Sequence, residues 1–231
     1  MENKKLHIAM IMDGNRRYAV KKLLPKVKGH EFGAKTFSKI AKSIKEIDEV
    51  NEFSFYTFSV QNFNRDKKEV DYIMNLFEKF FNEQIHILKE EKVKIKFLGR
   101  LNLFPENIQK ICKQAEEETK DFNEYRINFC FGYGGREELV DATKLIAKQI
   151  KEGTLQPEDI TEETISNELY SNNEPDIVIR TGGDHRTSNF LPWQTTYSEW
   201  FFLDKLWPEF KVDDLKECIS QFNKRERRFG K

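Results

Sequence analysis

The chain has 231 residues, a length that fits one domain of alternating strands and helices and allows a sizeable core. Its 39 basic and 39 acidic side chains balance, so the overall charge gives no indication of nucleic-acid binding. Three scattered cysteines without CxxC spacing argue against a zinc site or a disulfide framework and favour a reducing compartment.

Short apolar runs alternate with segments of helical periodicity along the chain. In chain order we predict a strand at 7–12, a helix at 32–47, strand 53–59, helix 69–88, strand 94–99, helix 105–119, strand 126–133, helices 136–153 and 161–169, strands 176–180 and 199–206, and helix 213–229. This alternation predicts one α/β domain over residues 1–231, with a central, mostly parallel six-stranded sheet and helices on both faces. The sequence shows no signal-peptide core and no apolar run near the ~18 residues of a membrane span, so we expect a cytoplasmic protein.

Three polar segments, 12–17, 57–65 and 180–190, directly follow predicted strands. Each carries Arg with Ser, Asn or Gly at close spacing. Guanidinium forks bind diphosphate oxygens, and glycine lets backbone N–H groups approach them closely. Ligands of parallel sheets bind beyond the carboxyl ends of the strands, so we expect the three segments to converge there on one anion site.

The individual loops leave plainer explanations open. Asp13 is suited to Mg²⁺, which prefers carboxylate and phosphate oxygens, but the first loop also fits a capped polar turn. The second loop, with Ser59 and Asn62, also fits a turn that feeds a helix, which we favour for that segment alone. Arg180 and Arg186 in the third loop form a diphosphate grip or else surface ion pairs.

A wide apolar stripe on the predicted helix 69–88 has two interpretations. Ordinary core packing is one, and the wall of a hydrophobic tunnel is the other. The stripe consists of Val70, Ile73, Met74, Phe77, Phe80, Phe81, Ile85 and Leu88. Residues 14–29 also contain six basic side chains and no acidic one, for which a solvated surface is the ordinary explanation.

Together the motifs resemble the cis-prenyltransferase family over about residues 6–230. The matching segments are HIAMIMDGNRR, KGHEFGAKT, FSVQNFNR, NFCFGYGGREEL, IVIRTGGDHRTSNFLPWQTTYSEWFF, LWPEF and RERRFG. The resemblance implies a fold with a hydrophobic tunnel and an Mg²⁺-dependent transferase of prenyl groups. Such an enzyme adds isopentenyl diphosphate to an allylic diphosphate, here expected to be farnesyl diphosphate, in successive cis steps.

The expected product is a long polyprenyl diphosphate such as undecaprenyl diphosphate, the precursor of a lipid carrier for cell-wall glycans. The resemblance also implies a homodimer without a nucleic-acid partner and with peripheral membrane contact for product release. The C-terminal Arg228 and Gly230 would then reach the site of the other subunit.

The resemblance assigns roles to single residues. Asp13 and Glu199 would bind Mg²⁺, and Asp13 and Asn62 would act in catalysis, Asn62 in proton handling. Arg180, Arg186 and Ser188 would hold isopentenyl diphosphate. All residues expected to bind substrate are Gly14, Asn15, Arg16, Arg17, Tyr18, Lys26, His30, Ser59, Val60, Gln61, Phe63, Arg65, Arg180, Arg186, Thr187 and Ser188.

Six positions depart from the family pattern and bear on substrate affinity and on the choice of allylic substrate. Arg16 replaces Gly, Tyr18 replaces Trp, Lys26 replaces Arg, Gln61 replaces Glu, Phe63 replaces Trp and Asp66 replaces Pro. Lys26 is a point charge without the bidentate fork of arginine, and Gln61 keeps hydrogen bonding but loses a charge.

The sequence argues against three other functions. A non-catalytic partner subunit would be expected to lose Asp13 and the phosphate loop, but Asp13, Arg17 and Arg186 are present. An unrelated α/β nucleotide or sugar-phosphate enzyme is disfavoured because no GxxxxGK[ST] or GxGxxG loop occurs. An all-α trans-prenyltransferase would need DDxxD pairs, and the single near match at 213–217 opens a predicted helix.

Overall fold

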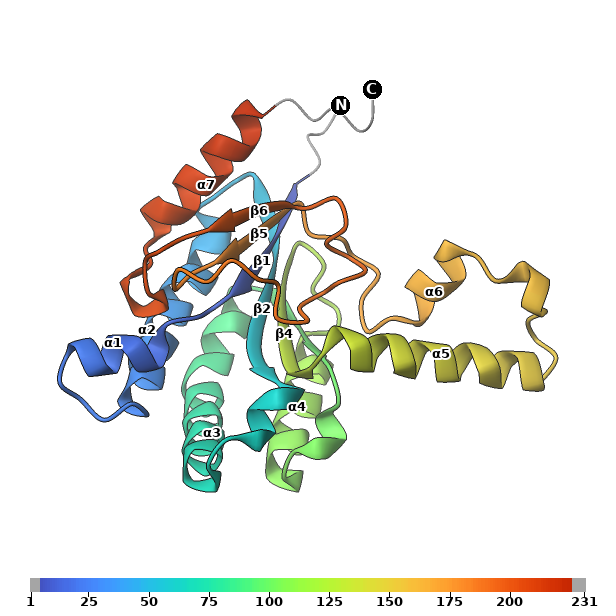
Figure 1. Ribbon diagram of the computed structural model, residues 1–231, viewed down its shortest axis with the longest axis horizontal. Coiled ribbons are helices and arrows are strands. Elements are labelled where there is room, and N and C mark those ends of the chain that lie inside the picture. Colours follow the sequence, from blue (N-terminus) through green and yellow to red (C-terminus); the bar gives the residue numbers. More distant parts are fainter. Residues whose placement is uncertain (1–4, 226–231) are drawn as a thin grey trace.

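The computed structural model describes residues 5–225 and contains a six-stranded sheet in the order β3-β4-β2-β1-β5-β6 (Figure 1). All neighbouring strands run parallel. The strands are β1 (Leu6–Ile11), β2 (Val50–Ser59), β3 (Val93–Leu98), β4 (Tyr125–Tyr133), β5 (Ile177–Arg180) and β6 (Glu199–Phe202). This confirms the predicted α/β fold with a parallel six-stranded sheet. Strand β6 ends at Phe202, four residues before the end of the predicted strand 199–206.

The described part of the chain forms seven α-helices. They are α1 (Asn15–Lys21), α2 (Lys28–Lys42), α3 (Lys67–Glu90), α4 (Glu106–Thr119), α5 (Gly135–Lys151), α6 (Glu162–Glu168) and α7 (Val212–Lys224). Short 3₁₀ turns are η1 (Ser43–Lys45), η2 (Val60–Asn64), η3 (Leu101–Leu103), η4 (Pro157–Asp159) and η5 (Trp207–Glu209). Helix α1 was not predicted, because seven residues with three cations and no apolar repeat carry no helical periodicity.

The two faces of the sheet are covered unequally. The larger core cluster joins alternate strand residues such as Ile8 and Phe55 to side chains from α2, α3, α4 and α7. The smaller cluster on the opposite face combines Ala9 and Val178 with Phe190 from the β5–β6 connection. The expectation of helices on both faces is therefore met mainly on one face, since a loop provides much of the packing on the other.

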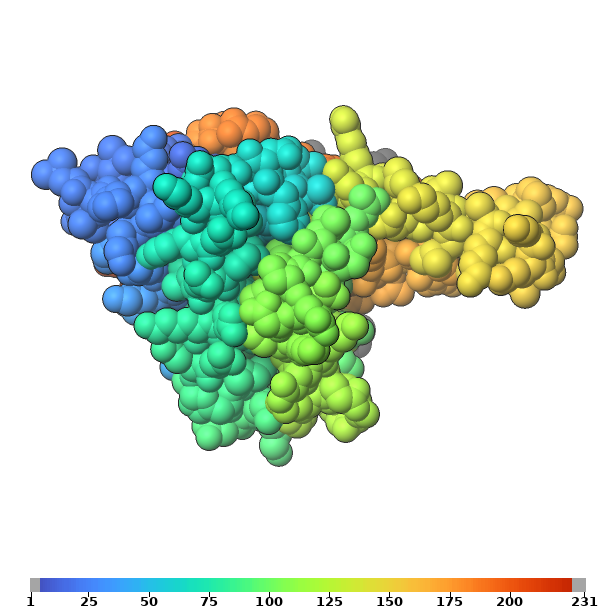
Figure 2. Space-filling model, turned by 90° about the horizontal axis from the view of Figure 1, so that it is seen from below, coloured from blue at the N-terminus to red at the C-terminus, as the bar shows by residue number. Residues whose placement is uncertain are grey.

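Helices α5 and α6 pack against each other and project away from the sheet as an arm (Figures 1 and 2). Val140 and Leu145 on α5 are 50% and 46% exposed, and Ile160 near α6 is 38% exposed. Among the described residues, no helix combines the length and apolar character needed to cross a membrane.

The register of the sheet brings the polar loops together. Ile11, the last residue of β1, pairs with Arg180, the last residue of β5. Beyond these ends, Thr181 N–H donates to the Ile11 carbonyl at 3.2 Å and Trp207 N–H donates to the Asp13 carbonyl at 2.9 Å. Segments far apart in sequence therefore share the carboxyl edge of the sheet, as their positions after predicted strands indicated.

Candidate active site

Asp13 lies between two arginines at this edge. Its Oδ2 accepts a hydrogen bond from Arg180 Nη2 at 3.0 Å, and its Oδ1 is 3.0 Å from Arg17 Nη2. Burial raises the pKa of the Asp13 carboxyl, but the hydrogen bond from Arg180 and the charge of Arg17 outweigh it, so the pKa is lower than usual. Asp13 is therefore ionised at neutral pH.

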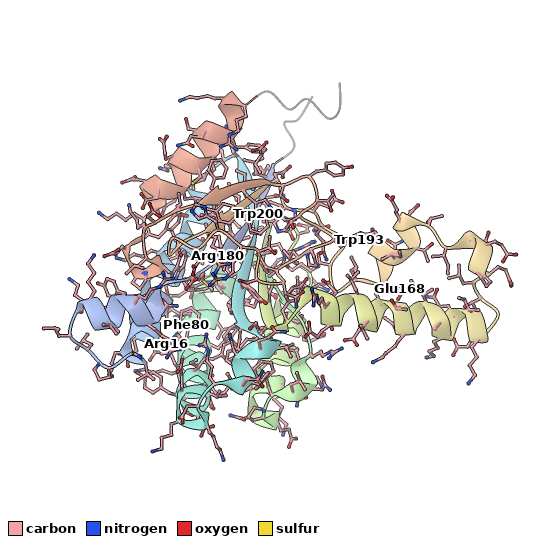
Figure 3. All side chains as sticks on the ribbon, viewed as in Figure 1. Arg16, Phe80, Glu168, Arg180, Trp193 and Trp200 are labelled. Atoms are coloured by element: carbon pink, nitrogen blue, oxygen red, sulfur yellow. The ribbon has the colours of Figure 1, made fainter. Side chains whose placement is uncertain are left out.

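Arg180 joins the first loop to the third (Figure 3). Its side chain is only 3% exposed, and besides Asp13 it donates from Nη1 to Ser188 Oγ at 2.8 Å and to the carbonyl of Arg186. Its Nε is buried and has no hydrogen-bond partner among the described residues. A buried guanidinium with one free N–H is a strong candidate for an anion contact.

Two glycines permit the close approach of these loops. Gly14 has φ 107° and a Cβ there would lie 3.0 Å from the backbone of Leu206. Gly182 has φ 95°, its carbonyl accepts from Arg17 Nη1 at 2.5 Å, and a Cβ would lie 2.6 Å from Arg17 Nη2. Both conformations are strained for residues with a side chain, so glycine is required for the packing of Arg17 between the loops.

The second loop forms η2 and caps itself. Asn62 Oδ1 accepts from the N–H of Ser59 at 3.0 Å, which fixes the Asn62 side chain over the end of β2. Gln61 Nε2 donates to Glu137 Oε1 at 3.0 Å, and Glu137 Oε2 accepts from Asn189 at 3.0 Å. The predicted turn is therefore confirmed as local structure, and the turn also fixes the position of the Asn62 side chain.

A second cationic group lies around Glu69 at the start of α3. Glu69 Oε1 accepts from Arg65 Nη1 at 3.2 Å and is 3.6 Å from His30 Nε2 and 3.9 Å from Arg16 Nε. Burial and the charge of Arg65 lower the pKa of His30 despite Glu69, so the imidazole is neutral at neutral pH. Its Nε2 is buried without a hydrogen-bond partner among the described residues.

Two polar cavities open at this edge of the sheet. The central cavity, of about 1040 Å³, lies between the three loops, and the α1 cavity, of about 510 Å³, lies between α1, α2 and η2. Asp13, Asn15, His30 and Arg65 line both. Fourteen of the predicted residues line one or both: Asp13, Gly14, Asn15, Arg16, Arg17, Lys26, His30, Ser59, Gln61, Asn62, Arg65, Arg180, Thr187 and Ser188.

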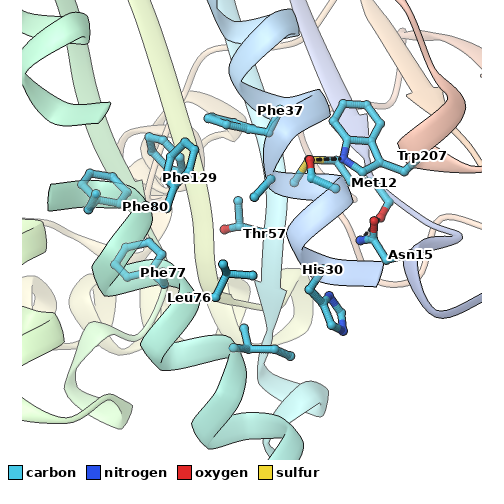
Figure 4. Close-up of a pocket in the computed structure, with 14 residues that line it drawn as sticks. Met12, Asn15, His30, Phe37, Thr57, Leu76, Phe77, Phe80, Phe129 and Trp207 are labelled. Atoms are coloured by element: carbon cyan, nitrogen blue, oxygen red, sulfur yellow. Dashed lines mark hydrogen bonds between the residues drawn. The ribbon is translucent and has the colours of Figure 1, made fainter. Parts of the chain in front are cut away.

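An apolar cavity of about 120 Å³ continues from the polar ones between α2 and α3 (Figure 4). Met12, Asn15 and His30 line all three cavities. Its apolar walls include Phe37, Leu76, Phe77, Phe80, Phe129 and Trp207. Phe77 and Phe80 are half-buried, whereas Met74, Phe81 and Leu88 of the same helix are buried. The stripe on α3 therefore serves both as core and as cavity wall.

Several predicted substrate residues do not line the polar cavities. Tyr18 packs on Phe32 with ring centroids 5.3 Å apart, and Phe63 packs on Phe58 at 4.9 Å. Val60 is the first residue of η2 and faces neither cavity. Arg186 is 62% exposed and forms a bidentate pair with Asp184 at 3.0 and 2.9 Å, as the surface ion-pair alternative expected.

Glu199 does not lie near Asp13 in this chain. It begins β6 and pairs with Ile177, whereas Asp13 follows the other end of β1, beyond Ile11 and Arg180. Ile177, which pairs with Glu199, and Arg180, which pairs with Ile11, are three residues apart on β5, and three residues of strand span about 10 Å. Glu199 instead forms an ion pair with Arg225. The expectation that Glu199 shares a metal ion with Asp13 is therefore wrong within one chain, because strand direction places the two acids at opposite edges.

Sequence reasoning missed three acidic residues of the site. Asp184 is 3.6 Å from Arg17, 3.8 Å from Arg180 and pairs with Arg186. Glu69 and Glu137 organise the cations and amides described above. Only Glu69 carried a signal, since it lies four residues after Arg65, the spacing of a helical ion pair.

The comparisons with known proteins agree with this geometry. The family model described as putative undecaprenyl diphosphate synthase matches residues 11–230. A tritrans,polycis-undecaprenyl-diphosphate synthase (geranylgeranyl-diphosphate specific) of Methanocaldococcus jannaschii is 42% identical, over 100% of this chain and 84% of that protein. An isoprenyl transferase of Halalkalibacterium halodurans is 44% identical, over 97% of this chain and 88% of that protein.

A solved structure is similar over the whole length. Lavandulyl diphosphate synthase from Lavandula x intermedia, in complex with dimethylallyl diphosphate, has a TM-score of 0.94 and 31% identity, covering 100% of both chains. Fold and site thus define a transferase of prenyl groups. The chain belongs to the cis-prenyltransferase family, the family of undecaprenyl diphosphate synthase.

Proposed function

We propose that this enzyme condenses isopentenyl diphosphate with an allylic diphosphate in successive cis additions and makes a long-chain polyprenyl diphosphate. The observation that carries this proposal is the continuity of the cationic cavities with the apolar cavity at Met12, Asn15 and His30. A substrate with an anionic head and an apolar tail matches both halves. Each CH₂ group that leaves water in the apolar part contributes about 0.8 kcal/mol.

The charges of the two polar cavities suggest that each cavity binds a different substrate. The α1 cavity, with Arg16, Arg17 and Lys26, suits the allylic diphosphate. The central cavity, with Arg180 and Ser188, suits isopentenyl diphosphate. The C4 carbon of isopentenyl diphosphate would attack C1 of the allyl group, the allylic diphosphate would leave with its bonding electrons, and one proton would be lost from the new chain.

The chain's own residues stabilise this step. Arg17 adds positive charge where the diphosphate leaves, and preorganised cations of this kind typically lower a barrier by about 3–4 kcal/mol each. Asn62, fixed by its bond to the Ser59 N–H, lies in the central cavity, where it would receive or relay the proton. Neutral His30, whose Nε2 has no hydrogen-bond partner among the described residues and lies 3.6 Å from Glu69, would bond to the allylic head.

The donor set at Asp13 fits Mg²⁺ in the way that diphosphate enzymes use it. The described residues hold no cluster of three or more His, Cys, Asp or Glu side chains that would form an all-protein metal site. Mg²⁺ commonly takes one or two carboxylates together with substrate phosphates, so ionised Asp13 beside a bound diphosphate suffices. When bound there, Mg²⁺ would neutralise diphosphate charge. Glu199 would have to come from a second copy.

The choice of allylic substrate is a separate part of the proposal. We propose farnesyl diphosphate and an undecaprenyl product, made in the cytoplasm and used as the precursor of a lipid carrier for cell-wall glycans. Geranylgeranyl diphosphate is the competing allylic substrate, because relatives from Methanocaldococcus jannaschii and Thermococcus kodakarensis, at 42% and 44% identity, are named as specific for it.

A homodimer without nucleic acid is also part of the proposal. The α5–α6 arm exposes Val140, Leu145 and Ile160, which suits a contact with a second copy. Arg228 and Gly230, expected to reach the other subunit's site, lie outside the described residues.

The test is incorporation of labelled isopentenyl diphosphate with Mg²⁺ and either farnesyl or geranylgeranyl diphosphate, followed by product chromatography. We expect a long product, faster incorporation with farnesyl diphosphate, and loss of turnover with a chelator. Asp13→Asn should lose about two to three orders of magnitude in rate. No incorporation with either allylic substrate would refute the function, and full activity in chelator would refute the role of Mg²⁺.

A further inference from the structure

The tip formed by the end of α1 and the turn to α2, residues 20–27, gathers apolar side chains at the surface. Leu23 is 95% exposed, Val20 52% and Leu24 39%. Three of the eight large exposed hydrophobic residues in the described part of the chain therefore fall within five positions. Single exposed apolar residues are ordinary, but a cluster at a protruding tip indicates an interaction site.

The turn holds Leu23 outward by a defined backbone. Leu23 N–H donates to the Val20 carbonyl at 3.0 Å and Leu24 N–H donates to the Ala19 carbonyl at 2.9 Å. Leu23 has φ 58°, a left-handed conformation that costs free energy for a leucine. Nothing in the core compensates for this cost, because the side chain is almost fully exposed.

The charge around this tip is positive. Residues 14–29 contain no acidic side chain, although Lys21 pairs with Glu209 and Lys28 pairs with Glu31. Lys22 and Lys26 form no ion pair with any residue between 5 and 225, and Lys22 lies 5.8 Å from the ring centre of Tyr18. Apolar side chains among unpaired lysines match the boundary of an anionic bilayer, where acyl chains meet negative headgroups.

The turn also borders the site. Val20 and Lys26 line the α1 cavity, which we assign to the allylic diphosphate. The α1–α2 region forms one extremity of the molecule, remote from the α5–α6 arm (Figures 1 and 2). A convex tip of this kind suits a bilayer, which needs no matching groove, better than a second copy, for which the arm already offers apolar residues.

We infer that residues 20–27 dock on an anionic lipid bilayer and hold the mouth of the α1 cavity at the level of the lipid headgroups. The purpose of this docking rests on the proposed function, because a long polyprenyl diphosphate must pass from the protein into a membrane. The docking itself requires neither substrate nor turnover.

The test is co-sedimentation of the full chain, without substrate, with vesicles of phosphatidylcholine containing about a third phosphatidylglycerol. Leu23→Asp should weaken binding about ten-fold, since it removes the most exposed apolar side chain and adds a negative charge. Lys22→Gln should weaken binding about five-fold on these vesicles and leave binding to pure phosphatidylcholine unchanged.

Leu103→Asp is the matched control, because Leu103 is an exposed leucine outside the turn and the charge change is identical. It should bind like the wild type. Leu23→Asp should melt like the wild type, since Asp tolerates the left-handed conformation at least as well as Leu.

Failure of the wild type to sediment with anionic vesicles would overturn the inference, as would equal binding by Leu23→Asp and Leu103→Asp. A smaller assembly mass for Leu23→Asp in vesicle-free solution would show a contact between copies and would also overturn it. Prenyl transfer in detergent by Leu23→Asp should stay at the wild-type level. A wild type inactive in that assay would contradict the proposed function and leave the vesicle result intact.

Discussion

Arg180 and Asp13 form an ion pair at 3.0 Å across 167 positions of sequence, and the Arg180 side chain is only 3% exposed. The pair ties β5 to the loop after β1 and directs a buried cation into the central cavity. Because Nη1 also donates to Ser188 Oγ and to the Arg186 carbonyl, the guanidinium binds three partners at once, while its Nε has no hydrogen-bond partner among residues 5–225.

Arg180→Lys should therefore harm both stability and activity. A lysine keeps the charge but cannot bond to Asp13, Ser188 and the Arg186 carbonyl together. We expect the free energy of unfolding to fall by about 2–3 kcal/mol and kcat to fall about a hundred-fold. Denaturant titration and steady-state rates measure the two effects. Unchanged values for both would show that the fork is not needed.

Arg186→Ala gives a contrasting outcome. Arg186 is 62% exposed and, among residues 5–225, its side chain pairs with Asp184 alone, so its loss should change stability by less than about 1 kcal/mol. If Arg186 is released from Asp184 and binds isopentenyl diphosphate, as we propose, the variant should raise the KM for isopentenyl diphosphate well above any change for farnesyl diphosphate. Equal increases for both substrates would show that Arg186 does not belong to the isopentenyl diphosphate site.

Phe80 and Phe81 are neighbours on α3 with different surroundings. Both line the apolar cavity, but Phe80 is half-buried, whereas Phe81 is 2% exposed and packs against Phe97 and Phe129 in the core. Phe80→Ala should lengthen the products because it enlarges the space for the growing chain. Phe81→Ala should lower stability by about 3–5 kcal/mol. Product chromatography together with denaturant melts separates the two, and identical product lengths for Phe80→Ala and wild type would refute the tunnel role.

The pH dependence of stability should reflect two buried histidines. Burial lowers the pKa of His7 below 6.5 despite Glu52, and burial with Arg65 lowers that of His30. Below pH 6.5 the unfolded chain therefore binds protons at these histidines that the folded chain does not. The free energy of unfolding is thus highest above pH 6.5 and falls as the pH drops below it. The loss is at most about 1.4 kcal/mol per histidine for each pH unit below 6.5.

Urea titrations at pH 7.5 and 5.5 measure this dependence, and His7→Gln should reduce it. Carboxylates with lowered pKa values, such as Asp13, remain ionised over this range and contribute little. Equal stability at the two pH values would mean that neither histidine is held neutral by the fold.

The parallel sheet and the convergence of the loops were predictable, because buried strands such as 7–12 are continuous apolar runs and the polar loops that follow them stand out. Helix α1 was not predictable. Its start depends on Gly14 at φ 107° and on the close packing of Gly29 against the Asn15 carbonyl, and neither leaves a periodic pattern in the sequence. The position of Glu199 followed from the predicted strands but was not used: Glu199 begins strand 199–206 and Asp13 follows strand 7–12, so a parallel sheet places them at opposite edges.

The sequence also did not reveal which side chains pair with one another in the site. The loop at 180–190 allowed surface ion pairs as one explanation, but it did not indicate that Asp184 would be the partner of Arg186 or that Arg180 would be the buried cation. These choices depend on burial and on contacts across more than a hundred positions. Phe63, expected at the substrate, instead packs on Phe58 and Phe104 because η2 turns its side chain toward the core.

The central claim is that the head of the allylic substrate lies in the α1 cavity and its tail lies between α2 and α3. A crystal structure with the unreactive farnesyl thiodiphosphate and Mg²⁺ tests it most directly. We predict the diphosphate beside Asp13 and Arg17 and the farnesyl tail against Phe37 and Phe80. A diphosphate bound elsewhere, or a tail that leaves the α2–α3 cavity empty, would contradict the account.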